Sequence, residues 1–339
     1  MLPVVHQQTR AGPERPSLER SATSAYVYPR RMDTLVDLLD GPRAKGAFLL
    51  RTVLDPPWSI RIEDEAPLTL VAVARGAAWL LPDHDPAVRL APGDVAIVRG
   101  PAPYTVADDP ATEPQVLIGP GQQCHTLWGE DLGHRWDLGV RTWGHDRDAA
   151  DMMLTGTYQT CGEISRRLLD ALPTVLVLHR DEWDCPLVDL LGAEIGRDDP
   201  GQEAVLDRLL DLLLIAALRA HLARPDTAPG WYLALADPVV GPALKLLQTD
   251  PAHQWTVELL ARQVGVSRAA LARRFTALVG EPPMAFLTGW RLGLAADLLR
   301  SGATLAAVAR RVGYGSPFAL STAFKRVHGV SPQQWREAG

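Results

Sequence analysis

The apolar positions in the last third of the chain recur with the spacing of an amphipathic helix, twice in the same order. The first copy covers residues 256–275 and the second covers residues 304–324. Each copy has an apolar helix, a glycine, a serine, and then a leucine and a phenylalanine four residues apart. That spacing places the leucine and the phenylalanine on one face of a second helix. The repeat therefore predicts two helical hairpins whose second helices leave their opposite faces free.

The residues at the ends of these helices have direct physical uses. A threonine begins each copy, and Thr256 and Thr304 can cap the first helix through their hydroxyl groups. Gly265 and Gly313 can take a positive φ where that helix must stop. The serine that follows each glycine can cap the second helix. These signals set where each predicted helix begins and ends.

The first half of the chain shows a different pattern, with short apolar runs between proline- and glycine-rich turns. Several short strands at close spacing are typical of a small barrel or sandwich. A leucine-rich stretch at 168–178 then passes from a helix to a strand, and residues 186–195 and 202–223 have helical patterns. The predicted strands cover residues 46–53, 58–62, 68–73, 77–81, 88–90, 94–98 and 115–118.

The predicted helix at 202–223 is apolar on more than one face, so it needs two surfaces to cover it. One is its own domain, and the other can be the same helix of a second subunit. Burial entirely within one domain is the alternative. The residues assigned to a dimer contact are Leu206, Leu209, Leu213 and Ile215.

These elements predict an α+β chain of two domains, because 339 residues exceed one typical core. A β-barrel with a helical linker region comes first, and an all-α domain with two helix-turn-helix units follows. The expected segments are a disordered tail (1–25), the barrel domain (26–180), a helical linker or dimerisation region (181–223), an interdomain linker (224–235) and the domain of the two helix-turn-helix units (236–339).

Charge separates the two halves. From Asp237 to the end there are 12 Lys and Arg residues against 6 Asp and Glu, a balance of +6. The whole chain carries −6, so the remainder carries −6 − 6 = −12. A basic module on an acidic body is typical of a nucleic-acid binder whose other half has a second task.

The C-terminal motifs resemble the DNA-binding domain of the AraC/XylS family of transcription regulators. Besides the two hairpins, the resemblance includes Gly-Glu-Pro-Pro-Met-Ala-Phe-Leu at 280–287, a linking helix around Arg291, and a closing segment at 323–336 that ends on Trp335 and Arg336. It implies a sequence-specific regulator that binds double-stranded operator DNA, with RNA polymerase as a further partner.

By position, the family pattern places one face of each second helix against DNA. Arg273 is the principal base reader, since an arginine fork pairs with guanine O6 and N7. Arg268 and Arg274 contact phosphates or stay solvated. The base contacts implied are Ala269, Ala272, Arg273, Pro317, Phe318, Ser321 and Thr322, and the phosphate contacts are Arg268, Arg274, Lys325 and Arg326.

Residues 90–98, Leu-Ala-Pro-Gly-Asp-Val-Ala-Ile-Val, resemble a cupin motif in which a Pro-Gly-Asp turn starts a strand. The resemblance implies that residues 26–180 form a cupin-like β-barrel that serves as a sensor domain. Metal-binding cupins add a His-x-His pair, which this chain lacks, and Tyr104 stands where a further histidine is expected. We therefore expect no metal and no cofactor. A barrel of this size holds one small ligand, and the expected effector pocket is lined by Val71, Trp79, Ile97 and Tyr104.

Two other classes of function remain open. Cys124, Cys161 and Cys185 form no disulfide framework or zinc-finger spacing, but they can carry a redox switch. A cupin enzyme with an incidental helical tail is the less favoured class. Cys124 and His125, even with His84 and His134, match no metal-site spacing. The chain also lacks a Gly-x-Ser-x-Gly, a phosphate loop and a His-Glu-x-x-His, so we expect no enzyme.

The pattern also bears on location and assembly. The N-terminus has no apolar signal core, and the apolar run at 212–218 is far shorter than a membrane span. We expect a cytoplasmic homodimer without a membrane partner, which regulates transcription in response to a small-molecule effector.

Overall fold

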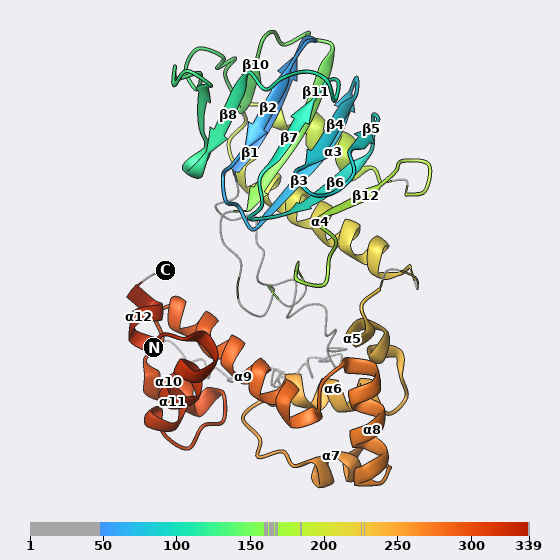
Figure 1. Ribbon diagram of the computed structural model, residues 1–339, viewed down its shortest axis with the longest axis vertical. Coiled ribbons are helices and arrows are strands. Elements are labelled where there is room, and N and C mark those ends of the chain that lie inside the picture. Colours follow the sequence, from blue (N-terminus) through green and yellow to red (C-terminus); the bar gives the residue numbers. More distant parts are fainter. Residues whose placement is uncertain are drawn as a thin grey trace, which may run out of the picture. The chain divides into compact units, whose positions relative to one another are not determined.

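The computed structural model describes residues 48–158, 162, 166, 169–183, 185–224, 226 and 228–337 (Figure 1). Within these residues the strands come first and most of the helices follow, which confirms the predicted α+β class. The expected tail at 1–25 and Cys161 lie outside the described residues. We refer to β1–β12 with α3 and α4 as the β-rich domain, and to α5–α12 as the helical domain.

The strands of the β-rich domain form two six-stranded sheets. Sheet A has the order β10 (Thr142–Gly144), β1 (Phe48–Leu54), β11 (Asp151–Tyr158), β3 (Leu68–Arg75), β6 (Val95–Arg99) and β12 (Val175–Leu178). Sheet B has the order β5 (Val88–Leu90), β4 (Ala78–Pro82), β7 (Tyr104–Ala107), β2 (Ser59–Ile62), β8 (Val116–Gly119) and β9 (Gln123–Thr126).

The two sheets pack as a sandwich, which is one of the two forms that the short apolar runs predicted. The hydrogen-bonded order of each sheet ends at an edge strand among the described residues, so the strands do not form one continuous ring. All seven strands predicted from apolar runs are present. The pattern missed β7, β9, β10 and β11. Strands β7, β9 and β11 mix polar with apolar residues, and β10 is only three residues long.

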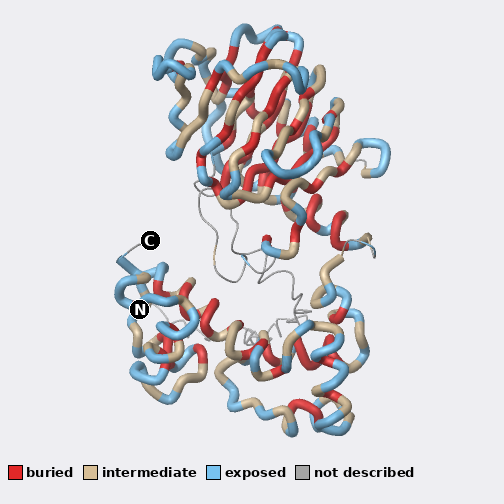
Figure 2. Tube along the Cα trace, viewed as in Figure 1, coloured by how far each residue is buried: buried red, intermediate tan, exposed pale blue. Residues whose placement is uncertain are grey.

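Alternation along the strands of sheet A separates two cores. On β3, Leu68, Leu70 and Ala72 belong to the core that lies under the helices. Val71 and Val73 belong to the core between the sheets, as expected when successive side chains point to opposite faces. Buried residues accordingly follow the strands of both sheets (Figure 2).

Helices α3 (Leu187–Ile195) and α4 (Gln202–Leu222) cover the outer face of sheet A. The contact is close at Gly156 of β11, where an added Cβ would lie 2.5 Å from Leu210 Cδ1. A side chain at position 156 would therefore have to displace the Leu210 side chain. This close approach explains why glycine stands at this position of the strand.

The faces of α4 correct part of the predicted dimer contact. Leu206 and Leu213 are both 0% exposed and lie in the core beneath the helix, so they are not available to a second subunit. Leu209 and Ile215 are half-buried. The exposed apolar residues of α4 are instead Val205 and Leu212. The sequence pattern could not separate these faces, since leucine occurs on both.

Asp94 anchors the turn that begins β6. Its carboxylate accepts hydrogen bonds from the backbone N–H groups of Ala91 and Arg180, both at 2.9 Å, and lies 3.0 Å from His179 Nδ1. Burial works against ionisation of this carboxyl, but these partners outweigh it and lower the pKa of Asp94. The aspartate of the Pro-Gly-Asp turn thus ties β6 to the end of β12.

The helical domain contains two hairpins joined by one long helix. The central helix α9 (Pro283–Arg300) buries Phe286 and Trp290 against the first hairpin and Leu292 and Leu299 against the second. The other helices are α5 (Gly230–Leu233), α6 (Val240–Thr249), α7 (Val257–Gln263), α8 (Arg268–Val279), α10 (Leu305–Arg311), α11 (Pro317–His328) and α12 (Pro332–Glu337).

The predicted caps are all formed. The hydroxyl oxygens of Thr256 and Thr304 accept from backbone N–H groups at 3.1 and 3.3 Å, and those of Ser267 and Ser316 do so at 3.2 Å. The two turn glycines have φ of 73° and 81°. The local signals therefore placed the four hairpin helices correctly.

The two turn glycines, Gly265 and Gly313, should differ in how much stability is lost when each is replaced by alanine. Alanine at Gly265 meets no heavy atom within 4 Å, so it suffers only the left-handed strain of roughly 1–2 kcal/mol. At Gly313 an added Cβ also lies 2.7 Å from both Cα and O of Ala252. We expect Gly313→Ala to lower the free energy of unfolding more than Gly265→Ala, measured by chemical denaturation. Equal losses would contradict the close approach at Gly313.

Candidate nucleic-acid interface and ligand site

Helix α8 has one buried face and one open face. Leu271 and Phe275 are fully buried and hold the helix on the first hairpin. Arg268 and Arg273 are exposed, and neither forms an ion pair with any described residue. Ala269 is exposed beside them, and Ala272 is half-buried. The structure thus gathers the residues predicted to contact DNA on the side of α8 away from the core.

Arg274 differs from its neighbours. Its Nε and Nη2 donate to one carboxylate oxygen of Asp237 at 2.9 and 2.7 Å, and Asp237 also accepts from the N–H groups of Val239 and Val240 at the start of α6. Burial opposes ionisation of Asp237, yet these contacts lower its pKa. Arg274 therefore holds α8 against α6, and its phosphate contact stays a prediction.

Helix α11, like α8, has one buried face and one open face, but different residue types occupy its open face. Leu320 and Phe324 are fully buried. Of the predicted base contacts, Pro317, Phe318 and Thr322 are exposed and Ser321 is half-buried. The predicted phosphate contacts Lys325 and Arg326 are exposed further along the helix. The half of α11 nearest the turn therefore has no charged side chain, whereas the corresponding half of α8 carries Arg268 and Arg273.

The sequence reasoning missed cations on the first helix of each hairpin. Arg262 lies in the last turn of α7, and Arg310 and Arg311 lie in the last turn of α10, all with exposed side chains. The first helix of a helix-turn-helix crosses the DNA backbone, where a cation can meet phosphate. The internal repeat could have revealed these cations, since Arg262 and Arg310 occupy the same position in the two copies.

Two of the four residues expected to line an effector pocket lie on the inner face of the sandwich. Val71 and Tyr104 face the space between the sheets. Ile97 faces the helices on the outer side of sheet A, and Trp79 lies on the outer side of sheet B, because its neighbours Ala78 and Leu80 point inward. The expectation for Ile97 and Trp79 was wrong, since strand period alone does not identify the inner face.

Hydroxyl groups missed by the sequence reasoning lie near Tyr104. Thr69 and Thr157 are paired on neighbouring strands, and both are buried. Thr69 shares a side-chain hydrogen bond with Tyr104. Burial raises the pKa of Tyr104, which keeps the phenol protonated at neutral pH. This group, which we call the hydroxyl cluster (Thr69, Tyr104 and Thr157), adds hydrogen-bonding groups to the inner walls of the sandwich.

The two cysteines that the structure describes, Cys124 and Cys185, do not support a redox switch. Burial, with a contribution from Asp131, raises the pKa of Cys124 to about 11, so the thiol stays protonated, whereas the thiolate is the reactive form. Cys124 packs in the core between the sheets and Cys185 in the core under the helices. The described residues contain no group of three or more His, Cys, Asp or Glu side chains that could hold a metal ion.

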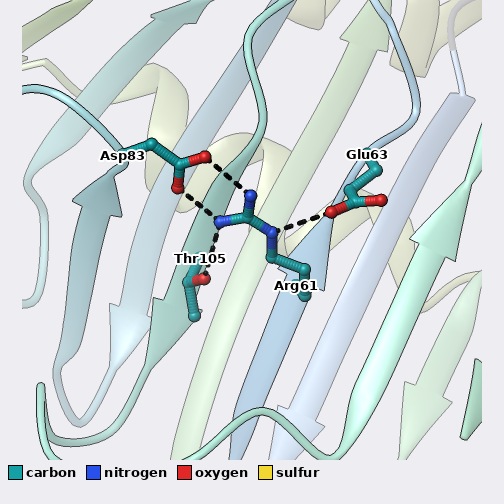
Figure 3. Close-up of polar contacts among 4 residues, drawn as sticks. All are labelled: Arg61, Glu63, Asp83 and Thr105. Carbon is teal, nitrogen blue, oxygen red and sulfur yellow. Dashed lines mark hydrogen bonds and ion pairs between the residues drawn. The ribbon is translucent and has the colours of Figure 1, made fainter. Parts of the chain in front are cut away.

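The outer side of sheet B carries a satisfied cation rather than a binding site (Figure 3). Arg61 on β2 donates to both carboxylate oxygens of Asp83 at 2.5 and 2.7 Å, to Glu63 at 3.1 Å, and to Thr105 on β7. The hydrogen bonds that Arg61 donates to Asp83 are the main cause that raises the pKa of Arg61. The group ties three segments of the sheet together.

Among the helices that the structure describes, none combines the length and apolarity needed to cross a bilayer.

Comparisons with known proteins agree with the division into a β-rich domain and a helical domain. Residues 33–223 match a family model described as cupin, and residues 260–338 match one described as a helix-turn-helix domain. An AraC-like transcription regulator of Streptomyces antibioticus is 35% identical, over 90% of this chain and 99% of its own length. AlkR, an HTH-type transcriptional regulator of Acinetobacter baylyi, is 28% identical over the same shares. The solved DNA-binding domain of AdpA, in complex with a target DNA, is 35% identical over 30% of this chain and 93% of that domain, with a TM-score of 0.29.

Proposed function

Because this chain belongs to the family of AraC-like transcription regulators, we propose that it binds operator DNA as a homodimer through α8 and α11 and responds to a small molecule held in the β-rich domain. The family is one of DNA-binding regulators, so the chain is not an enzyme. We place its action in the cytoplasm, with RNA polymerase as a further partner.

The observation that carries the DNA-binding mode is the pair of recognition helices with open faces on one rigid frame. Helix α9 has 18 residues and is therefore about 27 Å long. Its two ends pack against the two hairpins. Successive major-groove segments on one side of DNA are about 34 Å apart. We infer that α8 and α11 enter adjacent major-groove segments.

The exposed face of α4 supports a homodimer. Val205, Leu209, Leu212 and Ala216 follow one another at intervals of four, three and four residues, which is the seam spacing of a coiled coil. Val205 is 44% and Leu212 is 51% exposed. An antiparallel crossing at Leu212 would bring the acidic start of one helix alongside its partner's basic end, which carries Arg219. A second copy of α4 is the occupant we propose.

The hydroxyl cluster supports the sensing part of the proposal. Thr69, Tyr104 and Thr157 bring hydrogen-bonding groups into walls that are largely apolar, and ligand sites combine apolar walls with a few placed polar groups. We propose that the effector is a small organic molecule bound there. Effector and operator must then change each other's affinity by the same factor.

The proposal is tested by selection of bound duplexes from a random DNA library with the full chain, followed by footprinting on the enriched sequence. We expect each protein copy to protect two boxes about 10 base pairs apart on one side of the duplex. A selection that enriches no sequence would refute specific DNA binding. Protection of a single box would refute the paired docking of α8 and α11.

A further inference from the structure

The second recognition helix carries a large aromatic side chain that its hairpin does not use. Phe318, the second residue of α11, is 81% exposed and packs into none of the cores formed by the described residues. Leu320 and Phe324 hold the helix on its hairpin without it. An aromatic ring left in water forgoes a large favourable burial. Its exposure therefore indicates a surface that a partner covers.

The internal repeat shows that the fold does not require this ring. When the two hairpins are aligned on Ser267 and Ser316, Phe318 corresponds to Ala269, which is also exposed. Helix α8 thus forms the same hairpin with a methyl group at this position. The same alignment pairs Thr322 with Arg273, so the ring lies on the face that α8 offers to DNA.

The polar groups next to Phe318 are already engaged. Ser316 Oγ accepts from the Ala319 N–H at 3.2 Å, and Thr322 Oγ1 donates to the carbonyl oxygen of Phe318 at 3.1 Å. No residue of α11 before Lys325 is charged. An apolar surface in a major groove can meet one apolar group on the base edges, which is the C5 methyl group of thymine.

We propose that Phe318 reads thymine through its C5 methyl group, and that each operator site therefore consists of two chemically different boxes. Helix α8 reads one box by hydrogen bonds from Arg273, and α11 reads the other by apolar contact. This inference rests on the proposed function, since it requires α11 to enter a major groove.

The test uses the full chain and the duplex enriched from the random library. Each thymine is replaced singly by uracil, which removes only the methyl group. We expect affinity to fall about fourfold for each methyl group that Phe318 covers, as for one buried CH₂ group, and only in the box that α11 protects. Replacement by 5-bromouracil, whose bromine fills the place of the methyl group, should restore binding.

Two variants assign the effect to the side chain. Phe318→Ala should abolish the uracil penalty in that box, and it should fold normally because the ring is exposed. Arg273→Ala is the matched control in the other hairpin, and it should keep the uracil penalty while losing base preference in its own box. Thermal unfolding of both variants checks that the domain remains intact.

The outcomes separate this inference from the function on which it rests. If the chain enriches a sequence but uracil costs no affinity, or costs Phe318→Ala as much as the parent, the methyl readout is wrong and DNA binding stands. If Phe318→Ala impairs transcription in cells without changing DNA affinity, the ring contacts a protein and the inference is also wrong. If no sequence is enriched, the proposed function fails and this inference fails with it.

Discussion

Arg273→Ala will weaken binding to the selected operator by about 1–3 kcal/mol and relax the preference at one base pair. The side chain is exposed on α8, it has no ion pair with a described residue, and Leu271 and Phe275 fix the face from which it projects. Removal of the guanidinium leaves these packing contacts unchanged, so the loss reports on base readout. Competition binding against duplexes varied at each position measures it.

Arg326→Ala is the matched control for this variant. Arg326 is an exposed cation near the end of α11, predicted to meet phosphate. Its removal should weaken binding to all sequences alike and reduce the dependence of affinity on salt by about one counterion. If Arg273→Ala instead bound every duplex as tightly as the parent protein, the assignment of α8 as a recognition helix would be wrong.

Leu213→Glu will unfold the β-rich domain, whereas Leu212→Glu, one position away, will leave it folded. Leu213 is 0% exposed beneath α4, and a carboxylate there would be buried without a partner. Such changes are among the most destabilising single substitutions, at more than about 4 kcal/mol. Leu212 is 51% exposed, so its replacement places a charge in water in the monomer.

The same pair of variants tests the dimer. If two copies of α4 meet at Leu212, Leu212→Glu sets two like charges at the crossing and should yield a folded monomer. Light scattering gives the mass, and circular dichroism with thermal unfolding gives the folded state. A parent protein that is already monomeric would refute the α4 seam. A folded Leu213→Glu variant would contradict the burial of that side chain.

The hairpins of the helical domain were determined by the sequence alone. Threonine and serine caps, a glycine at the turn, and an apolar pair four residues apart act over one or two helical turns, so the signals and their effects lie in the same stretch of chain. Arg273 could be assigned to the open face because Leu271 and Phe275 define the buried one. The same local logic predicted most strands from their apolar runs.

The tertiary structure decided which face of each element is buried. Alternation on β4 and β6 left two equal choices of face, and only the packing of the sheets placed Trp79 and Ile97 outside the sandwich. Leucines on both sides of α4 hid its exposed seam until sheet A and α3 covered the other side.

Contacts between residues far apart in the sequence were also decided by the tertiary structure. Arg274 was expected, like Arg268, to contact phosphate or stay solvated, but Asp237, 37 residues away, binds its side chain. The hydroxyl cluster likewise joins Thr69 to Tyr104 and Thr157 from separate strands. A sequence pattern predicts structure that forms within one turn or one strand. The pairing of separate segments is set by the packing of the whole core, which no local window contains.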